Sequence, residues 1–255
     1  MRTAAAAFRL QLRIIRSDPD YVMPLVTVPM FTLIFLAIVQ HAGREDLTGY
    51  AVMAPVLIAL WALSIYVSGE IVSTDRSYGV LESLVASPAP FPVVIGSRVL
   101  AVTTVALAAF VEAWLVARLA FGITVEIHHP LVFGSALGAT VVATSGAGVI
   151  MAGLFVVGRS VRNFQNALTY PFYVLGGVLV PVTVLPDWIE PASRIVFLSW
   201  SADLLRDALA QPPIGNTPGR LAVILALGAA NFAIGYVVLQ RMLRRVRATG
   251  TLGFA

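Results

Sequence analysis

Few side chains in this sequence of 255 residues could carry out chemistry, and they lie far apart. Glu112 sits inside an apolar run, where an ionised carboxylate costs about 2.5–3.5 kcal/mol, so it must be paired, protonated or in contact with water. His128 and His129 could bind a metal or sense pH, although a solvated pair in a loop is the simpler interpretation. An intramembrane enzyme would need clustered His, Asp or Glu residues near one face, and none is evident.

Several kinds of catalytic site are excluded by missing residue types. The chain has no cysteine, which excludes disulfides, thiolate metal sites and cysteine nucleophiles. All 17 basic residues are arginine, so no lysine exists to complete the phosphate-binding motif G-x-x-x-x-G-K-[ST]. The motifs H-E-x-x-H and G-x-S-x-G are missing as well. We therefore expect neither an enzyme nor a conventional ATPase, and no metal or cofactor bound by this chain.

The elements that position these residues are predicted to be membrane-spanning helices. Hydrophobic residues make up 58% of the chain and charged residues 12%, against roughly 25% charged residues in a soluble domain. Several apolar runs exceed the ~18 residues typical of a transmembrane helix. The sequence predicts an all-α polytopic membrane protein, with residues 1–255 forming a single domain. The six predicted spans are residues 21–40, 50–72, 93–121, 131–157, 168–185 and 221–240.

The distribution of arginines predicts the orientation of these spans. An even number of spans places both termini on one side, and the segments on that side hold 12 of the 17 arginines. Because cytoplasmic loops carry the excess of basic residues, both termini are expected in the cytoplasm of a multi-pass protein of the cell membrane. This topology explains the net charge of +4, so no nucleic-acid partner is expected.

Residues 1–18 are predicted to form an interfacial helix. At 100° per residue, Arg2, Arg9, Arg13 and Arg16 fall within a narrow stripe on an otherwise largely apolar helix. Such a stripe suits the cytoplasmic headgroup layer, with membrane lipids as partners. A plain topology anchor is the alternative interpretation.

The segment after the second span, residues 75–88, is predicted to form a short amphipathic helix. Its apolar positions include Leu81, Leu84 and Val85, and prolines from Pro88 onward end the pattern because they lack an N–H group and clash with the preceding turn. A helix of this kind on one membrane face is expected to contact a partner. An ordinary interfacial loop helix without a partner is the alternative.

A second irregular stretch, residues 186–219, precedes the last span. It is apolar but short and interrupted by prolines, which favours re-entrant or interfacial helices at the outer membrane surface. Asp203, Arg206 and Asp207 are spaced three to four residues apart and are expected to pair along one outer helix.

Two stretches of the sequence carry recognisable motifs. The first has Asp75-Arg76, then GVLESL at 79–84, then Pro88. The second begins with GGV at 176–178 and ends at Arg206; its marker residues are Pro181, Leu185, Pro186, Trp188 and Pro191. Together they resemble the permease subunit of the ABC-2 type exporter family, in particular its drug-resistance and nodulation-type members. The chain departs from the family pattern at two places: the run before Gly79 has few acidic residues, and Ser199-Trp200 stands where an asparagine–proline pair is common. These departures weaken the assignment to a subfamily more than the assignment to the family.

The resemblance implies an exporter of two permease subunits, expected as a homodimer, and two cytoplasmic ATPase subunits that hold ATP and Mg. Residues 75–88 would be the coupling helix that seats in a cleft of the ATPase. Leu81, Leu84 and Val85 would fill that cleft, while Arg76 and Glu82 set the register at its rim. The residues assigned to coupling are Asp75, Arg76, Gly79, Leu81, Glu82, Leu84 and Val85.

The expected cargo is hydrophobic, amphipathic or lipid-linked, such as a drug, a lipid or a glycan intermediate, because the spans carry few fixed charges. Glu70 and Glu112 are the membrane-embedded polar residues that could line the transport path. A secondary carrier or channel not driven by ATP is the alternative. Such proteins need charged or broken-helix ion sites at mid-membrane, and only Glu112 approaches this requirement.

Overall fold

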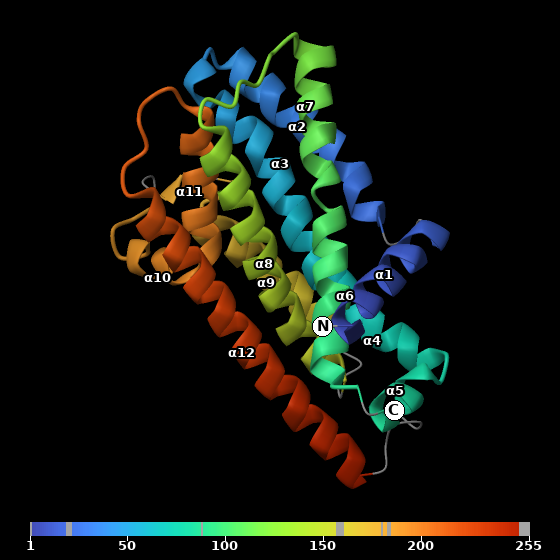
Figure 1. Cartoon of the computed structure of the whole chain (residues 1–255). Helices are drawn as coiled ribbons and strands as arrows, with labels where there is room; N and C mark the ends of the chain where they lie inside the picture. The colour runs from blue at the N-terminus through green and yellow to red at the C-terminus, as the bar shows by residue number, and fades with distance from the viewer. Residues whose placement is uncertain are drawn as a thin grey trace.

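A computed structural model of the chain describes residues 2–18, 22–87, 89–156, 161–179, 181–182 and 185–249. These residues form helices and no strands (Figure 1), which confirms the all-α prediction. The helices in chain order are α1 (Arg2–Ser17), α2 (Met23–His41), α3 (Thr48–Ala62), α4 (Ser68–Ser77), α5 (Val80–Ala86), α6 (Phe91–Val105), α7 (Ala108–Phe121), α8 (Pro130–Phe155), α9 (Val161–Leu175), α10 (Glu190–Ile195), α11 (Phe197–Leu209) and α12 (Thr217–Thr249). A 3-10 turn, η2 (Glu45–Leu47), precedes α3, and a π-helical turn, η3 (Leu63–Val67), joins α3 to α4.

Five helical stretches in the described part of the chain are long and apolar enough to cross a membrane. They agree with five of the six predicted spans to within a few residues, so the chain is a multi-pass membrane protein. The stretches are Met23–His41, Thr48–Ser77, Phe91–Phe121, Pro130–Phe155 and Thr217–Arg245.

The span predicted over residues 168–185 is not among the five, because α9 ends too early. With 15 residues α9 is about 22 Å long, which is less than the ~30 Å of a hydrocarbon core. A turn follows it, and Gly177 adopts a φ of +63°, the left-handed region that favours glycine. The sixth span therefore stays a prediction.

Helix α9 nevertheless runs along the bundle beside α3 and η3, so the chain passes from one end of the bundle to the other there. The Gln165 side chain donates to the carbonyl of Ile65 at 2.6 Å, and the Phe172 ring stacks on Trp61 with centroids 4.5 Å apart. Since residue numbers rise along α9 while they fall along its neighbour, the two run antiparallel.

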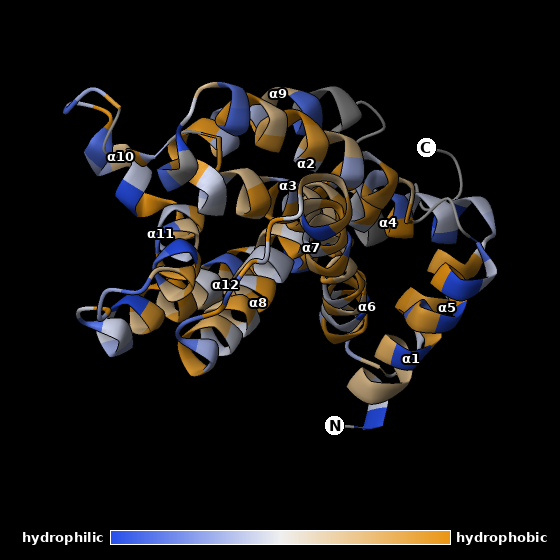
Figure 2. Ribbon diagram, turned by 90° about the horizontal axis from the view of Figure 1, so that it is seen from above, coloured by the Kyte–Doolittle hydropathy of each residue, from blue (hydrophilic) through white to orange (hydrophobic). Residues whose placement is uncertain are grey.

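The bundle has two distinct ends (Figure 1). One end carries α4, α5, the last turn of α8 and the C-terminal part of α12, with α1 beside them; we call it the α5 end. The other carries η2, the loop between α7 and α8, and α11; we call it the α11 end. Viewed from above, hydrophilic residues are frequent on α1 and α5 and near α10, while the central helices are mainly hydrophobic (Figure 2).

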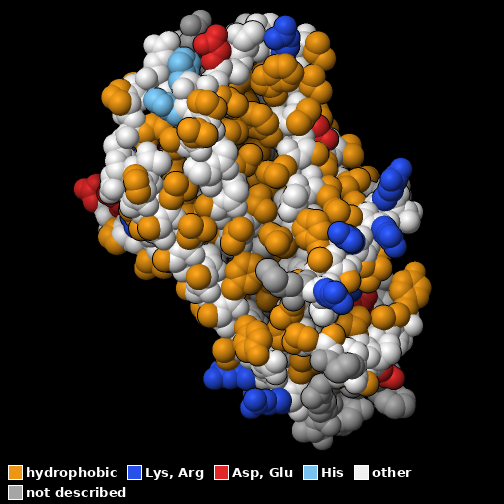
Figure 3. All heavy atoms as spheres, viewed as in Figure 1, with side chains coloured by type: hydrophobic (Ala, Val, Ile, Leu, Met, Phe, Trp, Pro, Cys, Tyr) orange, Lys and Arg blue, Asp and Glu red, His pale blue; other side chains and the backbone are white. Residues whose placement is uncertain are grey.

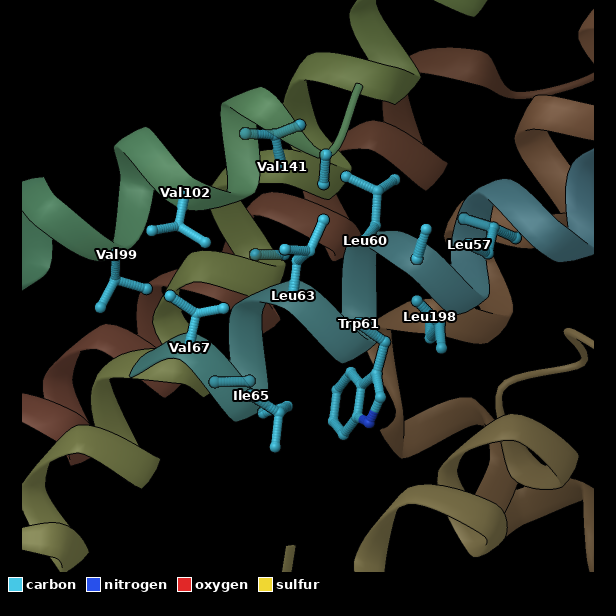
Figure 4. Packing of buried hydrophobic residues seen from close by; sticks show 14 of the residues in the cluster. Leu57, Leu60, Trp61, Leu63, Ile65, Val67, Val99, Val102, Val141 and Leu198 are labelled. Carbon is cyan, nitrogen blue, oxygen red and sulfur yellow. The ribbon is translucent and has the colours of Figure 1, made fainter. Parts of the chain in front are cut away.

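Helix α8 runs through the middle of the bundle and packs against α12, α11, α6 and α4. Side chains of α3, η3, α6, α8 and α11 converge on a continuous apolar core (Figure 4). Helix α8 closely approaches η3 and the first residue of α4 at Gly148, where an added Cβ would lie 2.6 Å from both Ser64 Oγ and Ser68 Oγ. The Ser64 hydroxyl donates to the carbonyl of Thr144 at 3.0 Å, which holds the π-helical turn against α8.

Candidate functional site

The segment predicted as one helix over residues 75–88 is two helices joined by a sharp turn; Pro88 lies outside the described residues. Helix α4 ends at Ser77, and Gly79 adopts a φ of +68°, a conformation that residues with a Cβ rarely take. The Tyr78 and Gly79 N–H groups donate back to the carbonyls of Thr74 and Arg76. Helix α5 therefore starts anew at Val80, and its faces do not continue those of α4.

Asp75, near the end of α4, is paired inside the protein. Its carboxylate accepts a hydrogen bond from the Arg98 guanidinium of α6, and the two side chains are 10% and 3% exposed. Arg98 Nε also donates to Gln11 Oε1 of α1 at 2.8 Å, and Gln11 is fully buried. This Gln11–Arg98–Asp75 network ties α1, α6 and α4 together.

Arg76 also points into the bundle. Its guanidinium donates to the carbonyl of Phe155 at 3.1 Å and to that of Val156, at the C-terminal end of α8. A cation at this position satisfies carbonyls that lack a partner within the helix and is favoured by the helix dipole. In this structure Arg76 joins α4 to α8, and its expected role in setting the register on a partner stays a prediction.

The apolar residues of α5 also pack against other parts of the same chain. Leu81 is 1% exposed and Val85 8% exposed, both belong to the core, and Leu84 is partly buried against it. These side chains hold α5 against the bundle, and Leu81 and Val85 are too buried to contact another protein in this arrangement. The assignment of the segment to coupling stays a prediction, with other residues available for contact.

Helix α5 and the turn before it expose a different surface, of which the sequence predicted only Glu82 as a contact residue. Tyr78 is 78% exposed and Val80 43% exposed, and Glu82 and Ser83 are exposed beside them. We call Tyr78, Val80, Glu82 and Ser83 the α5 face. The signal that could have revealed it is Gly79, since a glycine turn resets the helical phase and directs Val80 outward and Leu81 inward.

The two carboxylates suggested for a transport path lie on different helices. Glu70 is partly buried in α4, near the α5 end, whereas Glu112 is partly buried in α7 (Figure 1). One carboxylate oxygen of Glu112, Oε2, is buried and has no hydrogen-bond partner among the described residues. The structure does not bring the two residues together.

The marker residues before the last span lie at the α11 end. Pro181 and Leu185 are partly buried, Pro186 is exposed, and Pro191 stands in the first turn of α10, where a missing N–H group is tolerated. Trp188 is 80% exposed, as suits a side chain in the interfacial layer of a membrane. Residues 186–219 thus contain two short helices, of which α11 is largely buried and α10 lies more at the surface.

Arg206 fixes α11 to the end of α9 instead of pairing along its own helix. It is 6% exposed and donates to the carbonyls of Gly177 at 2.7 Å and Val178 at 2.9 Å. Burial lowers the pKa of its guanidinium to about 10, so it stays charged at neutral pH. The acids of the predicted trio pair elsewhere, Asp203 with Arg194 and Asp207 with Arg220.

We expect Arg206→Met to destabilise the α11 end. The variant keeps an apolar stem but leaves the buried carbonyls of Gly177 and Val178 without their donor, at about 1–3 kcal/mol each. Thermal unfolding in detergent measures the loss. Arg44→Gln is the control, because Arg44 and Asp46 form an exposed pair that contributes little to stability. Equal effects of the two variants would contradict the role of Arg206.

The two histidines fasten the loop before α8 to the end of α11. His128 Nδ1 lies 2.8 Å from the carbonyl of Leu209, and His129 Nε2 lies 3.1 Å from that of Pro212. Since a carbonyl only accepts, each of these nitrogens carries the hydrogen. Over the part of the chain that the structure describes, no group of three or more His, Asp or Glu side chains could hold a metal ion.

Comparison with known families supports the resemblance drawn from the two stretches. The family model described as ABC-2 type transporter matches residues 3–210, from α1 to the end of α11. No curated protein matches the chain. The family match covers most of the chain, including both motif stretches, α5 and four of the five long apolar stretches. The chain therefore belongs to the ABC-2 type transporter family, as a membrane permease subunit.

Proposed function

We propose that this permease couples ATP hydrolysis on a separate cytoplasmic ATPase subunit to the export of a hydrophobic, amphipathic or lipid-linked cargo. Permeases of this family typically pair with such a subunit, and this chain has no phosphate-binding loop of its own. The arginine distribution favours a cytoplasmic α5 end, where an ATPase would reach α5.

The observation that carries the proposal is that α5 combines an exposed face with firm attachment to the bundle. The α5 face offers an aromatic and an aliphatic side chain, Tyr78 and Val80, beside a carboxylate, Glu82. An aromatic anchor with a polar rim is typical of a protein–protein contact. A partner that binds this face would be connected to the bundle through a short helix that packs firmly against it.

The polar contacts of α4 would transmit motion of α5 to several helices. Asp75 joins α4 to α6 and α1 through Arg98, and Arg76 joins it to α8. The π-helical turn η3 lies just before α4, and π-helical turns are frequent at functional sites. We infer that α4, α5 and α1 move together with the nearby ends of α6 and α8. The turn η3, which joins α3 to α4, would bend to allow α4 to change its direction relative to α3.

A polar strip on η3 and α9 suggests where cargo would pass. The Tyr66 hydroxyl donates to Asn166 Oδ1 at 2.8 Å, and Tyr170, one turn further along α9, is 70% exposed. Exposing hydroxyl and amide groups to lipid tails in the membrane interior costs free energy. Facing a second copy of the chain, the strip would line half of a path for a cargo with polar and apolar parts, which favours a homodimer.

Reconstitution of the permease with its copurified ATPase in vesicles tests the proposal. We expect ATP and Mg to drive release of a fluorescent amphipathic dye across the bilayer, and vesicles holding the permease alone to show none. Transport driven by an ion gradient in the absence of ATP would contradict the proposal and favour a secondary carrier.

A further inference from the structure

A groove between α1 and α5 has a composition that the permease function does not explain. Its volume is about 590 Å³, and α1, α5 and the start of α6 form its walls. The apolar part of its lining includes Leu10, Leu84 and Val94, and the basic part is Arg9 and Arg13. The groove thus joins apolar and cationic surfaces.

The two arginines are available to a ligand. Arg9 and Arg13 are four residues apart on one face of α1, both are exposed, and neither guanidinium has an ion pair or hydrogen bond with any described residue. Basic side chains gather on the face where α1 lies (Figure 3). Guanidinium groups bind phosphate oxygens through two parallel hydrogen bonds, so a pair of them suits a phosphodiester.

The depth of α1 identifies the source of that phosphate. Gln11, between the two arginines in sequence, contacts Arg98, which is seven residues after the start of α6 at Phe91. At 1.5 Å per residue this contact lies about 10 Å along a membrane-spanning stretch. Helix α1 therefore lies at the boundary of headgroups and acyl chains, where phospholipids are the abundant phosphodiesters.

We propose that the groove binds one anionic phospholipid. Its phosphate would lie between Arg9 and Arg13, and the first part of an acyl chain would cover Leu10, Leu84 and Val94. Because α1 and α5 are the two walls, the bound lipid stabilises the position of α5 and makes the presentation of the α5 face dependent on membrane composition. The lipid site does not rest on the proposed ATPase partnership.

Native mass spectrometry of the full-length permease tests the site. The protein is extracted from vesicles of phosphatidylcholine containing phosphatidylglycerol, and the retained phosphatidylglycerol is counted. Arg9→Gln with Arg13→Gln is compared with Arg2→Gln with Arg16→Gln, which removes the same charge from α1 outside the groove. We expect the first variant to lose one retained lipid and on the order of tenfold in affinity, and the second to behave as the wild type.

Several outcomes would overturn the proposal. Equal loss in both variants would mean that the charge of α1 attracts lipids without a site, and no loss in either would mean that the groove is not used. Displacement of the lipid by inorganic phosphate alone would indicate a soluble ligand. If Arg9→Gln with Arg13→Gln keeps its lipid but loses copurifying protein, the groove belongs to a protein partner. Arg9→Lys with Arg13→Lys retains the charges but loses the paired guanidinium hydrogen bonds, and is expected to bind the lipid more weakly than the wild type and more tightly than the glutamine variant.

Discussion

Arg98→Met is expected to destabilise the folded permease by about 3–5 kcal/mol, because it leaves the buried Asp75 carboxylate without a cationic partner. The variant also removes the donor to Gln11, so α1 should detach more readily from α6. Thermal unfolding in detergent measures the stability, and limited proteolysis of α1 measures its attachment. Gln11→Leu is the milder comparison, since it removes a neutral group and leaves the ion pair intact.

A double variant separates the cost of an unpaired charge from the loss of packing. Asp75→Leu with Arg98→Met removes both charges, and such replacements of buried ion pairs are often neutral or stabilising when the new side chains pack well. We expect the double variant to unfold at a higher temperature than Arg98→Met, with a remaining loss relative to the wild type from the missing donor to Gln11. If the double variant is as unstable as Arg98→Met, the ion pair is not the reason for the effect.

Changes to the α5 face are expected to remove the ATPase subunit from the purified complex. Tyr78→Ala with Val80→Asp deletes the exposed aromatic anchor and places a charge beside it. Anchors of this kind contribute 2 kcal/mol or more to binding, which is a loss of roughly 30-fold or more in affinity. Copurification in mild detergent and stimulation of ATP hydrolysis measure the loss.

Two comparison variants make this second prediction specific. Leu131→Asp alters an apolar residue that is 89% exposed at the α11 end, so it should leave the ATPase bound. Leu81→Asp places a charge in the core and should lower the unfolding temperature instead. Unchanged copurification of Tyr78→Ala with Val80→Asp would contradict the role of the α5 face.

Hydrophobic patterning predicts most of this fold because the spans are local features. Five apolar runs are helices with nearly the expected ends, since a helix satisfies its own backbone hydrogen bonds in an apolar environment. The span predicted over residues 168–185 differs because its apolar run contains Gly176 and Gly177. The chain turns there, with Gly177 in a left-handed conformation.

The candidate site was less predictable because its contacts join residues far apart in sequence. The amphipathic pattern locates a short helix near residues 80–86 but does not show that Asp75 meets Arg98, or that Arg76 reaches the last carbonyls of α8. Arg206 is similar, since its partners are main-chain carbonyls after α9, which no side-chain pattern indicates. The spacing of charged residues along α11 therefore predicted ion pairs within that helix, whereas in the folded protein these residues bind groups on other elements.

Crosslinking from the α5 face determines whether an ATPase subunit contacts it in native membranes. The chain has no cysteine, so Val80→Cys introduces a single thiol on this face and Leu131→Cys a single thiol at the α11 end. Each variant is treated in native membranes with a short thiol–amine crosslinker. If α5 is the coupling helix, Val80→Cys forms a covalent adduct with an ATP-binding subunit and Leu131→Cys forms none. No adduct from Val80→Cys in membranes that still export cargo with ATP would contradict it.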